Sequence, residues 1–158
     1  MKADRHSIIK VSLILILTAY LCYLYSADYA KDIPIEKIAE AMEKEPSVTS
    51  LRKQGRTELR RFYQIDEKET NGCFYYKAAS PMAVEEVLII KAHDRKQVDT
   101  FLEAAQSHLS SQKQVFEGYG TSQMALLNEA IAASHGNYVY YFCGADASAL
   151  QKVFLSLI

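Results

Sequence analysis

The sequence predicts an α+β protein in which an N-terminal transmembrane helix precedes an antiparallel sheet with helices packed on one face. Three observations lead to this fold class. An uncharged apolar run covers residues 11–27, short stretches rich in aromatic and β-branched residues predict strands, and apolar stripes at helical spacing predict helices. The predicted order is strand, strand, helix, and this layout occurs twice.

The N-terminal run is long enough to cross a bilayer at its lower limit. No charge occurs between Lys10 and Asp28, and a helix of that length spans about 26 Å. Lys2 and Arg5 also precede the run, so the positive-inside rule puts the N-terminus in the cytoplasm and the C-terminal part outside the cell.

Cleavage and lipidation are the alternatives to a retained anchor. A signal peptidase site after Ala27 or Ala30 would place bulky Tyr25 or charged Asp28 three residues back. Lipidation at Cys22 needs a small residue before the cysteine, and Leu21 stands there. We therefore expect an uncleaved signal anchor.

These observations divide the chain into four parts. We predict a cytoplasmic N-terminus (1–10), a transmembrane anchor (11–27), a tether (28–33) and an extracytoplasmic α+β domain (34–158). The predicted localisation is the cell membrane, with a single pass.

The domain begins with helical and basic segments. Pro34 is typical of a helix start, and apolar residues follow it at helical spacing until Pro46 and Ser47, where we expect the helix to end. The segment 51–61 carries five basic residues and one acid. It is either a surface for anionic lipid or wall polymer, or a solvated helix face.

Two strands and a long helix follow. Asn71-Gly72 is a turn signal, the segments 73–79 and 85–92 predict an antiparallel hairpin, and Asp94 with Gln97 resembles a capping box. The apolar stripe of the next helix continues to Phe116, with Gln112 as a polar interruption.

The second half repeats this layout. We expect Ser122 to cap a short helix, and a turn at residues 135–137 to join the segment 131–134 to the strand 138–143. Asp146 or Ser148 caps the last helix. A long crossover between residues 92 and 131 to a parallel strand is the open alternative.

The composition excludes several classes of protein. The net charge of -1 gives no field that attracts nucleic acid. Phosphate-loop, GxSxG and HExxH patterns are absent from the sequence. We name no catalytic residue, cofactor or metal ligand, and we lean towards a protein that is not an enzyme.

Cysteine and histidine leave two alternatives open. Cys73 and Cys143 could form a disulfide if their strands were antiparallel neighbours. An envelope enzyme, hydrolytic or thiol-redox, would use Cys143 with His135 or His93. His93 and His135, with Asp94 or Asp146, could also bind a metal, although their spacing does not require it.

The tyrosine-rich strands supply the candidate binding residues. If the lysines of these strands mark a solvated face, an open sheet surface would carry Tyr75, Lys77, Lys91, Tyr138 and Tyr140. Tyrosine suits protein or glycan partners because its ring is large and its hydroxyl stays hydrated. The simpler interpretation is a sheet that borders solvent.

Three stretches of the chain, SPMAVEEVLIIKA, QKQVFEGYG and LLNEAIAASHGNYVYYFC, resemble the family called domain of unknown function 4358. The resemblance covers the chain from about residue 35 onwards. It implies a small extracytoplasmic protein of a Gram-positive bacterium and supplies no activity. Many members resemble lipoproteins, and this chain departs from them at Leu21-Cys22.

The sequence thus predicts a membrane-anchored extracytoplasmic binding or interaction module, with an envelope protein or glycan as partner and no nucleic acid. The alternatives are the envelope enzyme and a structural accessory subunit of an envelope complex.

Overall fold

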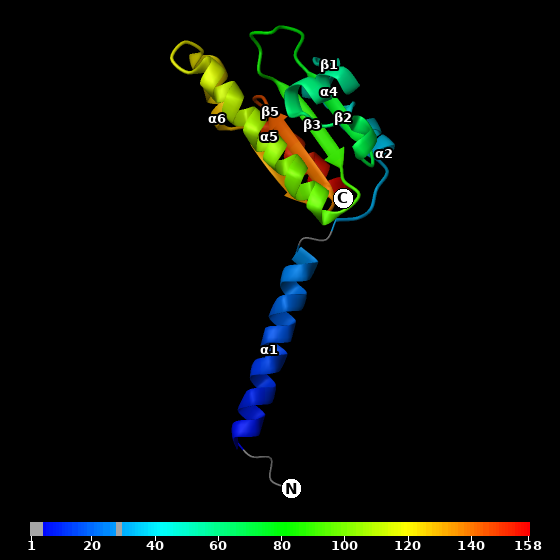
Figure 1. The fold of residues 1–158 in the computed structure, drawn as a ribbon, viewed down its shortest axis with the longest axis vertical. Coiled ribbons are helices and arrows are strands. Elements are labelled where there is room, and N and C mark those ends of the chain that lie inside the picture. Colours follow the sequence, from blue (N-terminus) through cyan, green and yellow to red (C-terminus); the bar gives the residue numbers. More distant parts are fainter. Residues whose placement is uncertain (1–4, 28–29) are drawn as a thin grey trace.

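The structure, a computed structural model, describes residues 5–27 and 30–158, with side chains for residues 9–23 and 30–158. Residues 1–4 of the predicted cytoplasmic N-terminus and residues 28–29 of the predicted tether lie outside the described residues. Helix α1 (Arg5–Ala27) confirms the predicted N-terminal helix and extends away from the rest of the molecule (Figure 1). Its large apolar side chains between Ile9 and Tyr23 are exposed. Within the described part of the chain, no helix combines the length and the apolar character that crossing a membrane requires.

The domain is built on one five-stranded sheet. Its strands are β1 (Arg52–Lys53), β2 (Cys73–Lys77), β3 (Glu86–Lys91), β4 (Ile131–His135) and β5 (Tyr138–Cys143). The spatial order is β1-β2-β3-β5-β4, and every neighbouring pair is antiparallel. This confirms the predicted antiparallel sheet and both hairpins, and it excludes the long crossover to a parallel strand. Strand β1 was not predicted, because two residues give no periodic signal.

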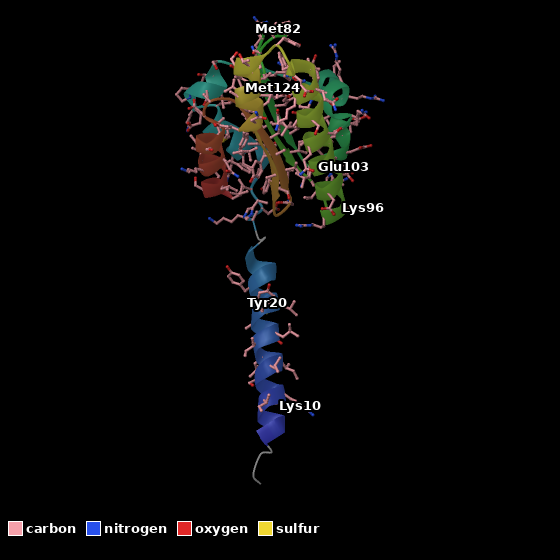
Figure 2. The ribbon with its side chains drawn as sticks, turned by 90° about the vertical axis from the view of Figure 1, so that its left-hand side faces the viewer. Lys10, Tyr20, Met82, Lys96, Glu103 and Met124 are labelled. Atoms are coloured by element: carbon pink, nitrogen blue, oxygen red, sulfur yellow. The ribbon has the colours of Figure 1, made fainter. Side chains whose placement is uncertain are left out.

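Helices cover both faces of the sheet, so the prediction of helices on one face is wrong. One face carries α4 (Arg56–Tyr63), α5 (Arg95–Phe116) and α6 (Thr121–Asn128). The opposite face carries α2 (Ile35–Met42), α3 (Pro46–Thr49) and α7 (Ala147–Leu157). A short 3₁₀ turn, Glu67–Glu69, follows α4. Figure 2 shows the sheet between α5 and α7.

The reason for this two-sided cover lies in the central strands. Every residue of β3 and of β5 is buried. A strand with one solvated face alternates apolar and polar residues, whereas these strands are apolar on nearly every position. Two hydrophobic cores therefore form, one on each side of the sheet.

Local signals account for most element boundaries. The Asp94 carboxylate accepts a hydrogen bond from the Gln97 N–H at 2.9 Å, which confirms the predicted cap of α5. Gly72 has a φ of +128°, and a Cβ there would lie 2.5 Å from Ile35, so only glycine fits this turn. Pro46 begins α3 rather than ending a helix, and α6 begins at Thr121 after Gly120 rather than after Ser122.

Candidate functional site

A buried carboxylate lies at the start of β3, on the face covered by α4 and α5. Glu86 is 1% exposed. The sheet register places it opposite Lys77 on β2 and opposite Cys143 on β5. An ionised group in such a position is costly unless charges and hydrogen bonds compensate it.

Four side chains compensate Glu86, two at each carboxylate oxygen. The hydroxyls of Tyr63 and Tyr75 donate to Oε1 at 2.8 and 2.7 Å. The Lys77 ammonium and His108 Nε2 contact Oε2 at 2.8 and 3.0 Å. These donors come from α4, β2 and α5, so the cluster ties both helices to the sheet.

The electrostatics of the cluster fix the role of His108. Burial alone raises the pKa of Glu86, but the hydrogen bonds and charges of His108 and Lys77 outweigh burial and lower that pKa to about 2. The carboxylate is therefore ionised and can only accept hydrogen bonds. Because an ionised carboxylate only accepts, Nε2 of His108 carries a proton and donates it to Glu86.

The tyrosines around Glu86 are held in their neutral form. Burial and the nearby Glu86 charge raise the pKa of both Tyr63 and Tyr75. Tyr141 lies beside them, with its ring 5.6 Å from that of His108, and burial raises its pKa too. The Tyr141 hydroxyl is buried and makes no hydrogen bond with a described residue, although the Cys143 thiol lies near enough to affect its pKa.

A polar groove of about 620 Å³ opens above this cluster, between α4 and α5. His108 and Tyr63 line it, so the groove reaches the buried network from outside. The other lining residues come from the end of α4 and the exposed side of α5: Arg61, Phe62, Gln64, Ile65, Thr100, Glu103, Ala104, Ser107, Ser111 and Gln112. Among these residues, Arg61 is positively charged and Glu103 is negatively charged. The others are neutral polar or apolar residues.

The aromatic ring of Phe62, a residue that lines the groove, also contacts the network. It packs against the His108 ring with a centroid distance of 6.0 Å, and the Lys77 ammonium lies 5.1 Å from its centroid. Gln64 follows with a φ of 58°, which ends α4 and lets Ile65 return to the core. The sharp end of α4 thus shapes one wall of the groove.

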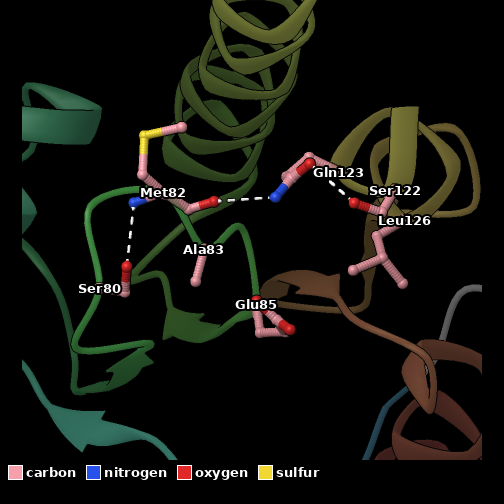
Figure 3. A pocket seen from close by; sticks show the side chains of 7 residues that line it. All are labelled: Ser80, Met82, Ala83, Glu85, Ser122, Gln123 and Leu126. Carbon is pink, nitrogen blue, oxygen red and sulfur yellow. Dashed lines mark hydrogen bonds between the residues drawn. The ribbon is translucent and has the colours of Figure 1, made fainter. Parts of the chain in front are cut away.

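A second hollow, of about 340 Å³, lies between the loop before β3 and α6 (Figure 3). The Gln123 amide donates to the Met82 carbonyl at 3.2 Å, and the Met82 N–H donates to the Ser80 hydroxyl at 3.2 Å. Ser122 donates to the Gln123 side-chain oxygen. These polar groups hydrogen-bond to one another. This hollow therefore has fewer free hydrogen-bonding groups for a ligand than the α4–α5 groove has.

The predicted open tyrosine face does not exist, because these residues are buried on two different faces. Tyr75 and Lys77 lie on the Glu86 side, whereas Lys91, Tyr138 and Tyr140 lie on the opposite side. The prediction failed because it took lysine as a mark of solvent. Both lysines are largely buried, each beside a carboxylate.

Lys91 and Tyr138 hold the segment that joins α1 to the domain. The Lys91 ammonium donates to the Ile33 carbonyl at 2.9 Å and pairs with Asp32 at 2.6 Å, which lowers the pKa of Asp32. The Tyr138 hydroxyl accepts from the Ile33 N–H at 2.8 Å and donates to the Ile33 carbonyl at 2.7 Å. Tyr140 accepts a hydrogen bond from Gln151 of α7.

The structure does not support the two alternatives that involve cysteine, the disulfide and the cysteine–histidine enzyme. Strand β3 separates the strands of Cys73 and Cys143, and the register places the cysteines opposite Ile90 and Glu86, at its two ends. Both thiols are free, so the structure does not support the alternative of a disulfide between them. Burial raises the pKa of Cys143 to about 11, and His135 lies at the far end of the β4–β5 hairpin, so neither residue activates the other.

The histidine metal site also lacks support in the described residues. Among them, no group of three or more cysteine, histidine or acidic side chains is placed to hold a metal ion. His93 is exposed, and its N–H donates to the Gln97 side chain.

The sequence analysis missed Glu86, His108 and Tyr63. A sequence signal did exist: Glu86 occupies an inward position of an apolar strand, and His108 falls three residues after Ala105 on the apolar stripe of α5. Two polar residues on inward faces of neighbouring elements indicate a buried pair.

Fold and site together define a small α+β domain whose sheet encloses a carboxylate–histidine network beneath a polar groove. The model of the family described as Domain of unknown function (DUF4358) matches residues 44–144. The chain belongs to this family, and the match includes the whole Glu86 network. No curated protein and no solved structure matches the chain.

Proposed function

We propose that the protein is a membrane-anchored extracytoplasmic binding module, and that the α4–α5 groove binds a neutral, hydroxyl-rich ligand such as an envelope glycan. The observation that carries the proposal is His108. Its Nε2 is fixed on Glu86 while the residue lines the groove, and we assign its Nδ1 to a hydrogen bond with the ligand. Binding sites commonly combine a few such fixed polar groups with apolar walls.

The character of the ligand follows from the groove lining. Arg61 and Glu103 balance in charge, so the groove favours neither an anion nor a cation. Serine, threonine and glutamine side chains donate and accept hydrogen bonds equally well. Phe62 adds a flat apolar surface, on which the apolar side of a sugar ring can pack.

Two features of the sequence support the anchor. Residues 11–27 carry no charge, and Lys2, Arg5 and Lys10 precede them. The test is protease treatment of intact cells that express the full chain with a C-terminal tag. We expect the tag to be removed while the cytoplasm stays protected. A tag that survives until the cells are lysed would contradict the proposed orientation.

The groove is tested by a pair of matched substitutions on α5. Ser107 lines the groove and Ser110 does not, yet both are exposed. Ser107→Trp should fill the groove without touching Glu86, whereas Ser110→Trp should leave it open. The full chain in detergent is titrated calorimetrically with a β-1,4-linked N-acetylglucosamine tetrasaccharide, with soluble peptidoglycan fragments and with polyglycerol phosphate.

We expect a neutral saccharide to bind to the wild type and to Ser110→Trp, with at least a tenfold loss of affinity in Ser107→Trp. Binding of polyglycerol phosphate alone would contradict the neutral ligand. Equal binding by both tryptophan variants would show that the groove is not the site.

A further inference from the structure

The two edges of the sheet differ in how they are protected. Strand β1 is two residues long and consists of Arg52 and Lys53, and shortness and positive charge both discourage pairing with another strand. Strand β4 is five residues long, IAASH, and carries no lysine, arginine or proline. It lies at the other end of the strand order and pairs with β5 alone.

The hairpin register identifies the unpaired groups of β4. A two-residue turn, Gly136-Asn137, closes the hairpin at the pair His135 and Tyr138. The closing pair of such a turn is hydrogen-bonded, and hydrogen-bonded pairs then alternate along the strands. The bond from the Ala92 N–H to the Asn137 carbonyl, towards β3, agrees with this alternation. The main-chain N–H and C=O groups of Ala132 and Ser134 therefore point away from the sheet.

These outward groups have no hydrogen-bond partner among the described residues. Exposed main-chain groups along a strand edge form a template for an added strand. The chemistry that fits them is an extended polypeptide, because only a second main chain supplies donors and acceptors at the same spacing.

We propose that β4 pairs with β4 of a second copy of this chain, in antiparallel alignment centred on Ala133. In this register Ala132 lies opposite Ser134 of the second copy, and each such pair exchanges two main-chain hydrogen bonds. Ala133 lies opposite itself, in a non-hydrogen-bonded pair whose Cα atoms are about 4.5 Å apart. Ile131 lies opposite His135.

The side chains favour this occupant. Side chains of similar size occupy matching positions on either side of Ala133, with Ala132 against Ser134 and Ile131 against His135. Near the two-fold axis, therefore, no bulky or charged side chain lies opposite its own copy. The net charge of -1 adds little repulsion between two copies. Pairing joins the two five-stranded sheets into one continuous sheet.

The first test is disulfide trapping in the full chain in detergent, on a Cys22→Ser background. The remaining thiols are poor cross-linkers because burial raises the pKa of Cys73 to about 12 and that of Cys143 to about 11. Ala133→Cys places two thiols face to face across the two-fold axis. The matched control, Ala132→Cys, points to the other side of the sheet and lies opposite Ser134.

We expect at least tenfold more cross-linked dimer from Ala133→Cys than from Ala132→Cys after mild oxidation. Sedimentation of the detergent-solubilised wild type should show a dimer, and Ala133→Lys should shift it to monomer by placing two like charges together. A monomeric wild type at every concentration, or equal cross-linking of the two cysteine variants, would overturn the proposal. So would a segment of another protein found paired with β4.

Discussion

The two faces of the sheet solve the same packing problem with different chemistry. The face under α2, α3 and α7 is filled mainly by apolar and aromatic side chains, with Phe154 in contact with the rings of Tyr138, Tyr140 and Phe142. Its buried Lys91 pairs with Asp32, whose side chain is exposed. The face under α4 and α5 encloses an ionised carboxylate with four donors. Apolar packing tolerates changes of similar shape, whereas a charged network depends on each partner. We therefore expect the residues of a binding site to lie on the polar face.

The largest effect is expected at Glu86. Glu86→Gln keeps the size of the side chain but removes the charge that Lys77 and the other donors require. We expect a loss of about 3–5 kcal/mol in the free energy of unfolding, the usual cost of breaking a buried ion pair. Denaturant unfolding measures it. Glu85→Gln, one residue away and half-buried, is the control and should change stability by less than about 1 kcal/mol. A near-neutral Glu86→Gln would mean that the network is dispensable.

The same network predicts loss of stability in acid. The pKa of Glu86 is about 2 in the folded chain, below its ordinary value of 4.5. A lowered folded-state pKa stabilises the protein above pH 4.5, and this contribution disappears as the pH falls towards 2. The expected loss is on the order of 3 kcal/mol. It should be absent in Glu86→Gln, and a wild type and variant with identical acid unfolding curves would contradict the assignment.

Two tyrosines near Glu86 allow a comparison between a buried hydroxyl that donates a hydrogen bond, in Tyr75, and one that does not, in Tyr141. Tyr75→Phe removes a hydrogen bond to a charged acceptor and should cost about 1.5–3 kcal/mol. Tyr141→Phe removes a buried hydroxyl without a hydrogen-bond partner among the described residues, so stability should stay the same or rise. Thermal unfolding of both variants checks the contrast. A larger loss in Tyr141→Phe would show that this hydroxyl has a partner.

The smallest effect is expected on the apolar face. Ile89 is fully buried on this face, and Ile89→Leu keeps an apolar side chain of the same volume. We expect a loss below about 1.5 kcal/mol, smaller than that of Glu86→Gln. If the leucine variant lost more stability than the glutamine variant, the contrast between the two faces would be reversed.

The sequence was sufficient for most of the element order, the antiparallel hairpins and the cap of α5, because these depend on local patterns. It was insufficient for the faces of the sheet. Period-2 alternation shows that Tyr75 and Lys77 share a side, but not which helices cover that side. Lys91 and Tyr138 received a binding role because their partners, Asp32 and Ile33, are more than 50 residues away in the sequence. The candidate site was missed for the same reason: Glu86 and His108 meet only when α5 packs on the sheet.

The most direct test of the account is the position of the proton on the ring of His108. The full chain is labelled with ¹⁵N, and its imidazole nitrogens are observed by NMR about two pH units above the ordinary histidine pKa of ~6.5. His108→Gln assigns the signals. We predict a proton on Nε2, donated to Glu86, and an Nδ1 whose chemical shift changes when a saccharide fills the groove. A proton on Nδ1 together with a bare Nε2 would contradict the carboxylate–histidine contact and the groove site that depends on it.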